Sequence, residues 1–235
     1  MSIMKPSSTL APSMRPLGIA SSRRGFLAGL AGFAFIAPCG PALAGDPVKV
    51  LALGDSLTAG YGLKQGEGFA DQLQTALAKM GRPVTVINGG VSGDTSAGGL
   101  ARIDWALSDK PAVVIVELGA NDMLRGIDPE STRQNLAGII EKAQAAGAKV
   151  LLAGMKSQRN LGADYVQRFD AIYPELAKQY EVAFYPFFMD GIVGADGTAD
   201  TKLLQGDGLH PTEAGAKVIV DGIMPALLKL LDAKS

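Results

Sequence analysis

A serine, a histidine and an aspartate carry the chemistry that this sequence can do. His210 is the one histidine in the chain, and imidazole is the usual base for activating a hydroxyl nucleophile near neutral pH. Asp207 comes three residues earlier, across a turn that Gly208 makes easy, so its carboxylate can fold back to the Nδ1–H of His210. Ser56 follows a predicted strand and opens a predicted helix. These residues predict nucleophilic catalysis in which Ser56 attacks an acyl group.

Acyl transfer through a serine also needs hydrogen-bond donors for the charge that develops on the carbonyl oxygen, each worth about 3 kcal/mol. Two candidates come after neighbouring predicted strands. They are the N–H of Gly93, which no side chain obstructs, and the side-chain amide of Asn121. The backbone N–H of Ser56 is the third, because it lies at the start of the helix that Ser56 opens. Ser56, Gly93 and Asn121 therefore form the predicted oxyanion hole.

The residue inventory excludes several other chemistries. One histidine and one cysteine, Cys39, cannot supply the ligands of a zinc site. No G-x-G-x-x-G or G-x-x-x-x-G-K-[ST] loop is present, and residues 45–235 contain no G-x-S-x-G elbow and no S-x-x-K pair. We therefore expect a reaction that uses no metal and no organic cofactor.

Residues this far apart in the sequence meet only if the fold brings several strand ends together. Short β-branched runs alternate with longer stretches of helical spacing, which is typical of a parallel sheet with helices on both faces. The predicted strands are Val48–Leu53, Val84–Asn88, Ala112–Leu118, Lys149–Ala153 and Val182–Tyr185. The predicted helices are Phe69–Lys79, Gly99–Leu107, Pro129–Ala146, Tyr165–Tyr180 and one from Pro211 to about Leu231 with Pro211 in its first turn. Ligands of such sheets bind at the carboxyl edge, where the candidate residues lie.

The segment Met155–Asp164 follows the fourth predicted strand and so reaches the same edge. It lacks helical periodicity and contains Gly162, which indicates a loop that can move over a substrate. Met155 and Leu161 are its sizeable apolar side chains and the predicted contacts for an acyl chain, worth at most ~1–3 kcal/mol each. Trp105 has helical spacing with apolar neighbours, so we expect it in the core and not in the site.

The first 44 residues differ in composition from the rest of the chain, with four basic residues and no acidic one. Arg23 and Arg24 begin a motif of the twin-arginine type, an apolar run follows, and Ala42-Leu43-Ala44 fits a cleavage site. The predicted organisation is a twin-arginine signal peptide over 1–44 and one catalytic domain over 45–235. The apolar run is too short to span about 30 Å of hydrocarbon, so a membrane anchor is the weaker interpretation. Lipidation of Cys39 is a second minor alternative, disfavoured by Pro38.

Cleavage after Ala44 would leave 18 basic and 23 acidic residues, a net charge of −5. Nucleic acid and anionic membrane surfaces are therefore not expected partners. We expect a small ester or thioester substrate, a periplasmic or secreted location, and the twin-arginine export machinery as a partner of the precursor.

Four short blocks, in order along the chain, resemble those of the SGNH or GDSL-type hydrolases. They are Gly54-Asp55-Ser56-Leu57, Gly93, Gly119-Ala120-Asn121-Asp122 and Asp207-Gly208-Leu209-His210-Pro211. The resemblance spans residues 48–230 and implies a flavodoxin-like three-layer sandwich with a five-stranded parallel sheet. It assigns the family's catalytic Ser, Gly, Asn and His to Ser56, Gly93, Asn121 and His210, with Asp207 as third member of the triad. Further matches, such as Ser92-Gly93-Asp94-Thr95, are similar to the branch of periplasmic acyl thioesterases, lysophospholipases and arylesterases.

The resemblance implies hydrolysis of carboxylic esters or thioesters through an acyl-serine intermediate. Two other functions stay open. An acyltransferase or deacetylase acting on a sugar or alcohol would use the same triad, although the sequence shows no extra module for holding a polymer. A non-catalytic exported binding protein would have lost one of the four blocks, and none is lost.

Overall fold

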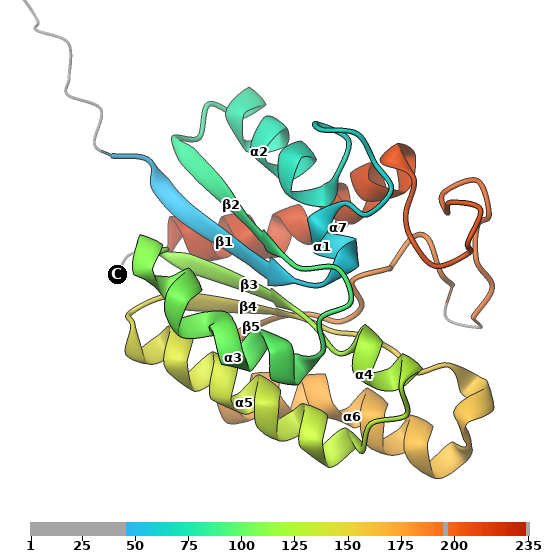
Figure 1. Cartoon of the computed structure of the whole chain (residues 1–235). Coiled ribbons are helices and arrows are strands. Elements are labelled where there is room, and N and C mark those ends of the chain that lie inside the picture. The colour runs from blue at the N-terminus through green and yellow to red at the C-terminus, as the bar shows by residue number, and fades with distance from the viewer. Residues whose placement is uncertain (1–45, 195–196, 234–235) are drawn as a thin grey trace, which may run out of the picture. The chain divides into compact units, whose positions relative to one another are not determined.

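The computed structural model describes residues 46–194 and 197–233, so the predicted signal peptide and its cleavage site lie outside the described residues. Five strands form one sheet in the order β2-β1-β3-β4-β5, and every neighbouring pair is parallel (Figure 1). The strands are β1 Val48–Gly54, β2 Val84–Gly90, β3 Val113–Glu117, β4 Lys149–Ala153 and β5 Ala183–Tyr185.

The inner strands are near-continuous apolar runs because both of their faces are covered. β3 is buried along its whole length, and β1 is buried from Val50 onward. Helices α2 (Phe69–Lys79) and α7 (Glu213–Asp232) lie on one face of the sheet (Figure 1). Helices α3 (Ser96–Ala106), α5 (Pro129–Ala145) and α6 (Ala163–Gln179) cover the other (Figure 1). The predicted three-layer α/β fold with a five-stranded parallel sheet is confirmed.

The strand order determines where a site can form. β1 lies between β2 and β3, so the chain winds in opposite directions from β1 and leaves a crevice at the carboxyl ends of these strands. In register, Gly54 at the end of β1 is aligned with Gly90 of β2 and Glu117 of β3. The loops after the three strands therefore begin side by side.

Two helices begin where a threonine side chain caps them. Thr95 accepts a hydrogen bond from an N–H in the first turn of α3, which starts three residues earlier than predicted. Thr212 caps α7 in the same way. Pro211 lies before this cap and not in the first turn of the helix, so that part of the prediction is wrong. The capping threonine, rather than the proline, determines where α7 starts.

Among residues 46–194 and 197–233, four helical turns are too short to show a period in the sequence. They are α1 Ser56–Ala59, η1 Leu107–Asp109, α4 Ala120–Leu124 and η2 Arg159–Leu161, where η denotes a 3₁₀ turn.

Trp105 does not lie in the core, since 78% of its surface is exposed. Helix α3 buries Gly99, Ile103 and Ala106, which recur at the i, i+4, i+7 spacing of one helix face. Trp105 falls outside that face, so the core position expected for it is wrong.

Candidate active site

Ser56 stands on the turn between β1 and α1, at the carboxyl edge of the sheet. Asp55 before it is fully buried, and its Oδ1 accepts a hydrogen bond from the N–H of Leu57 at 3.0 Å, which caps α1. Gly60 ends the helix after one turn, at a φ of 80° that favours glycine. Four residues align too few peptide dipoles to create the positive helix terminus that the sequence suggests. The Ser56 N–H is therefore best regarded as a single donor.

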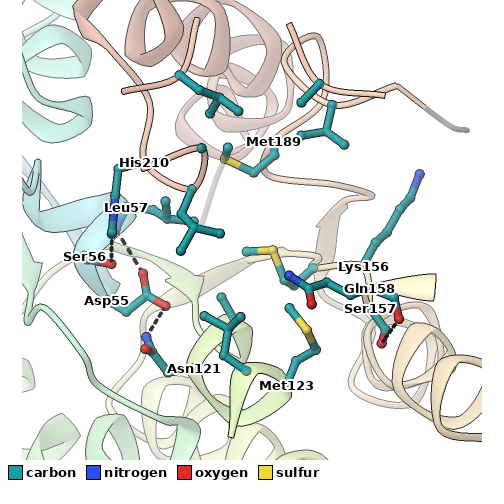
Figure 2. Close-up of a pocket in the computed structure, with 18 of the residues that line it drawn as sticks. Asp55, Ser56, Leu57, Asn121, Met123, Lys156, Ser157, Gln158, Met189 and His210 are labelled. Carbon is teal, nitrogen blue, oxygen red and sulfur yellow. Dashed lines mark hydrogen bonds between the residues drawn. The ribbon is translucent and has the colours of Figure 1, made fainter. Parts of the chain in front are cut away.

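His210 and Asp207 form a continuous chain of hydrogen bonds with Ser56. Oγ of Ser56 lies 2.9 Å from Nε2 of His210 (Figure 2), and Nδ1 of His210 lies 2.6 Å from Oδ2 of Asp207. When Nδ1–H donates to the carboxylate, Nε2 is the nitrogen left to accept the serine proton. The structure thus brings the three predicted triad residues together.

The Asp207 carboxylate is oriented by its own loop. Its Oδ1 accepts hydrogen bonds from the N–H groups of Leu209 at 2.9 Å and His210 at 3.1 Å. The turn is possible because Gly208 adopts a φ of 69°. The hydrogen bond from Leu209, followed by the one from the His210 ring, lowers the pKa of Asp207 to about 2. Asp207 is therefore ionised at neutral pH and keeps Nδ1 protonated.

Gln205 joins the loop of His210 to the loop of Ser56. Its N–H donates to the carbonyl of His210 at 2.8 Å. Its side-chain nitrogen donates to the carbonyls of Pro211 at 2.9 Å and Tyr61 at 2.7 Å. Tyr61 also packs its ring against the imidazole of His210, with 4.6 Å between centroids. Sequence patterns do not point to Gln205, because it acts only through backbone carbonyls.

The predicted oxyanion-hole residues converge on one cleft. Gly93 follows β2 at a φ of 84°, and its carbonyl accepts a hydrogen bond from Nη2 of Arg125 at 2.7 Å. Asn121, in α4, donates from Nδ2 to Oδ2 of Asp55 at 3.0 Å (Figure 2). Within residues 46–194 and 197–233, the N–H groups of Ser56 and Gly93 donate no hydrogen bond. Both are available to a ligand in the cleft.

Two buried carboxyl groups lie behind the β1–α1 turn. Oε2 of Glu117 accepts hydrogen bonds from the Thr58 hydroxyl at 2.8 Å and the Asp55 N–H at 3.4 Å. Burial, with a smaller contribution from the Asp55 charge, raises the pKa of Glu117 well above its usual range. Burial also raises the pKa of Asp55 to about 6, against hydrogen bonds from Leu57 and Asn121 that lower it. Because two close carboxylates do not readily both ionise in a dry site, the negative charge of this pair lies mainly on Asp55, whose pKa burial raises less than that of Glu117.

A cleft of about 930 Å³ opens over these groups, which is the size of a small-molecule site. Met189 and Met123 flank it from two sides, and Ser56 and His210 stand at one end (Figure 2). The apolar part of its wall includes Leu57, Met123, Met155, Phe187, Met189 and Leu204. Of these, Met155 alone is a substrate contact predicted from the sequence.

The segment after β4 is held against α6. Asp170 accepts hydrogen bonds from the N–H of Ser157 at 2.7 Å and from Nη1 of Arg159 at 2.8 Å. Met155 is 6% exposed and lies in the cleft wall, whereas Leu161, at the end of η2, is 38% exposed and does not line the cleft. The structure therefore does not place Leu161 in the cleft wall, although Arg159 and Asn160 of the same turn line it.

Further polar contacts fix the loops of the site to one another. Arg102 donates from Nε to Oδ2 of Asp94 at 2.7 Å and from Nη2 to the carbonyl of Gly54 at 2.9 Å. Asp122 accepts hydrogen bonds from both the N–H and the hydroxyl of Ser96. Glu117 is the last residue of the buried strand β3 and Asp122 lies inside the short helix α4. Spacing in the sequence does not identify the hydrogen-bond partners of either acid.

Among the described residues, no group of three or more His, Cys, Asp and Glu side chains is placed to hold a metal ion. The same residues include no helix that is both long and apolar enough to cross a membrane.

The fold and the site together define a serine hydrolase of the flavodoxin-like α/β type. Residues 52–218 match the GDSL-like Lipase/Acylhydrolase family, and the chain belongs to this family. The chain is 43% identical over 183 residues to Esterase TesA of Pseudomonas aeruginosa, covering 77% of this chain and 89% of that protein. It is 37% identical over 187 residues to thioesterase 1/protease 1/lysophospholipase L1 of Escherichia coli strain K12, covering 79% and 86%.

A solved structure supports the same conclusion. The crystal structure of AlinE4, an SGNH-hydrolase family esterase, has a TM-score of 0.66 at 46% identity and covers 81% of this chain and 100% of AlinE4. The predicted class is therefore confirmed: the chain is an ester-hydrolysing serine hydrolase.

Proposed function

We propose that the chain cleaves carboxylic ester or thioester bonds of small acyl or aryl substrates through an acyl intermediate on Ser56. One observation carries this proposal. Oγ of Ser56 lies 2.9 Å from Nε2 of His210, whose Nδ1 lies 2.6 Å from Asp207, at the end of a largely apolar cleft. A hydroxyl with a base in hydrogen-bond reach, and a carboxylate orienting that base, is the arrangement that acyl transfer requires.

In the first half of the reaction, Oγ of Ser56 attacks the carbonyl carbon while Nε2 of His210 takes the hydroxyl proton. The carbonyl oxygen becomes an oxyanion, which the N–H groups of Ser56 and Gly93 and the amide of Asn121 stabilise. The bond to the alcohol or thiol then breaks, and the imidazolium gives its proton to that leaving group. Asp207, ionised at neutral pH, stabilises the imidazolium between these two proton transfers.

In the second half, a water molecule takes the place of the leaving group. His210 removes a proton from the water as the water oxygen attacks the acyl carbon, and the same three donors bind the second oxyanion. The carboxylic acid leaves when the bond to Oγ breaks, and the proton on Nε2 returns to Ser56.

The lining of the cleft supports an acyl or aryl group as the bound part of the substrate. Met123, Met155 and Met189 all contribute to its wall. Methionine side chains have three rotatable bonds and adapt to ligands of different shape. The names of the relatives, an esterase and a thioesterase/lysophospholipase, agree with an ester or thioester as the bond that is cleaved.

The composition of the first 44 residues supports export of the precursor by the twin-arginine route, cleavage after Ala44, and a periplasmic or secreted enzyme. The N-terminal sequence of the protein recovered from the periplasm or medium tests this part. A first residue other than Gly45, or export that continues unchanged when Arg23 and Arg24 are both replaced by lysine, would contradict it.

The experiment that tests the reaction compares Ser56→Ala with Ser131→Ala, an exposed serine on α5 outside the cleft. Ser56→Ala should remove nearly all hydrolysis of p-nitrophenyl esters and thioesters of graded chain length, and Ser131→Ala should not change it. A fluorophosphonate probe, followed by peptide mass spectrometry, should label Ser56 alone. Labelling of another serine, or wild-type turnover by Ser56→Ala, would contradict the proposal.

A further inference from the structure

The reaction described above makes no use of the Asp55 carboxylate, although it is fully buried beside the nucleophile. Burial of a charged carboxylate is unfavourable, and it raises the pKa of Asp55 to about 6. Capping α1 through the N–H of Leu57 does not require a charge, because serine or asparagine caps a helix equally well. The charge of Asp55 therefore calls for a second explanation.

The second oxygen of the Asp55 carboxylate contacts Asn121. Its Oδ2 accepts the hydrogen bond from Nδ2 of Asn121 at 3.0 Å, across the gap between the β1–α1 turn and α4 (Figure 2). Within the described part of the chain, this is the single hydrogen bond of the Asn121 side chain. The terminal torsion of an asparagine side chain has a broad, shallow energy profile. The contact with Asp55 is thus what fixes the plane of the amide.

A primary amide carries two N–H bonds in one plane, so holding one of them also sets the direction of the other. Asn121 and Ser56 line the same cleft. Asp55 itself cannot swing away, because Glu117 accepts a hydrogen bond from its N–H and Leu57 donates to its Oδ1. An ionised carboxylate has an oxygen for each of its two donors, Leu57 and Asn121.

We propose that Asp55 is the positioning residue of the oxyanion hole: its carboxylate holds one amide hydrogen of Asn121 so that the other points to the carbonyl oxygen of a substrate bound at Ser56. This inference rests on the proposed function, since it takes Asn121 as an oxyanion donor. It adds that Asp55 contributes to the rate only through Asn121.

The test is a double-mutant cycle with Asp55→Asn and Asn121→Ala. Leu57 and Asn121 donate to different oxygens of Asp55, and the single oxygen of asparagine can occupy only one of these two positions. With the oxygen held by Leu57, the amide of Asn121 loses its acceptor and its fixed direction. We expect Asn121→Ala to lower kcat on the order of 10²-fold. Asp55→Asn should lower kcat by roughly tenfold with KM within about twofold of wild type, because an oxyanion exists only in the transition state. The double variant should be no slower than Asn121→Ala alone, within about threefold.

A matched control is Asp128→Asn. Asp128 accepts a hydrogen bond from an N–H two residues on and caps α5, as Asp55 caps α1, but it lies outside the cleft. Its replacement should leave kcat unchanged. Multiplied losses in the double variant, on the order of 10³-fold, would mean that Asp55 acts through Ser56 or the α1 turn and would overturn the inference. An Asn121→Ala enzyme with wild-type kcat would remove the oxyanion role of Asn121 from the proposed function, and the inference with it.

A second measurement does not depend on turnover. The ¹⁵N resonance of the Asn121 side-chain amide, assigned by its loss in Asn121→Ala, should shift in Asp55→Asn. Backbone resonances of helices far from the site should not move, which also shows that the variant is folded. An unchanged Asn121 amide in a folded Asp55→Asn protein would overturn the inference even if kcat had fallen.

Discussion

Two aspartates of the site show how surroundings give one residue type two different properties. Asp207 accepts hydrogen bonds from Leu209 and His210, which bring its pKa to about 2. Asp55 is buried, and its pKa is about 6 because desolvation exceeds the effect of the hydrogen bonds that it accepts. Asp207 therefore stays ionised wherever His210 can serve as a base, whereas Asp55 gains a proton in mildly acidic solution.

This difference predicts how pH changes the effect of Asp55→Asn. Above about pH 7 Asp55 is ionised, and kcat/KM of the wild type should exceed that of the variant by about tenfold. Below about pH 5 the wild-type carboxyl is neutral and resembles asparagine, so the ratio should approach one. The titratable groups that face Asp55 are Glu117 from β3, Asp94 from the loop after β2, and His210, and all are common to both proteins. Rates measured across this range with one ester check the prediction, and a constant ratio would contradict it.

Residue types alone could predict the triad. His210 is the one histidine and so the one candidate base, and Asp207, three residues before it, is the carboxylate that can orient its ring. Glu117 and Gln205 could not be predicted in the same way. Glu117 acts on a backbone N–H and a hydroxyl, and Gln205 acts on backbone carbonyls. Such contacts have no spacing rule, since the partners meet only in the folded chain.

Between elements, the site depends on two loops that keep Ser56 and His210 in contact, and Gln205 is the link between them. Gln205→Leu keeps the size of the side chain and removes both donors. We expect kcat to fall by about tenfold, with a loss of stability of about 1 kcal/mol. The control is Gln144→Leu, which removes a donor to the carbonyl of Tyr180 at the end of α6. Steady-state rates and urea unfolding of both variants check this, and equal loss of kcat in the two would show a general effect of destabilisation.

The loop after β4 gives a second prediction at this scale, because one of its two apolar side chains lines the cleft. Met155→Ala should lower kcat/KM for p-nitrophenyl octanoate by about tenfold while hardly affecting the acetate. Leu161→Ala, outside the cleft wall, should change neither ester. If Leu161→Ala lost as much on the octanoate as Met155→Ala, the loop would have to close over the acyl chain in the complex.

The long elements could be predicted because apolar periodicity over 11 or more residues, as in α2 and α5, indicates a buried helix face. Periodicity does not show which face packs against the sheet, so Trp105 could not be placed by its spacing. It also does not show where a cap ends a loop. For that reason the sequence placed Pro211 in the first turn of α7, whereas Thr212 caps the helix and Glu213 is its first residue.

For the whole molecule, the site is a source of instability that the rest of the fold compensates. Asp55 and Glu117 are both fully buried at the ends of β1 and β3, the strands at the centre of the core. An acid whose pKa is raised by folding contributes stability that is fully present below its unfolded pKa of about 3.8 and is lost as pH rises through the folded value of about 6. The pH dependence of the Asp207 contribution runs in the opposite direction. Because folding lowers the pKa of Asp207, its contribution to stability is lost as pH falls toward about 2.

Comparison of wild type with Asp55→Asn isolates the Asp55 contribution, because Asp207 and all other groups titrate in both proteins. Each unit of pKa shift corresponds to about 1.4 kcal/mol of unfolding free energy. Roughly two thirds of the change that the Asp55 shift causes falls between about pH 4.5 and 7.5. The wild type should therefore lose about 2 kcal/mol of unfolding free energy relative to the variant over that range. Urea unfolding of both proteins at several pH values measures this difference. If the unfolding free energies of the two proteins changed with pH in parallel, burial would not raise the pKa of Asp55. Convergence below about pH 4 and separation above about pH 6 would show that the wild type keeps a charge beside Ser56 at the expense of stability.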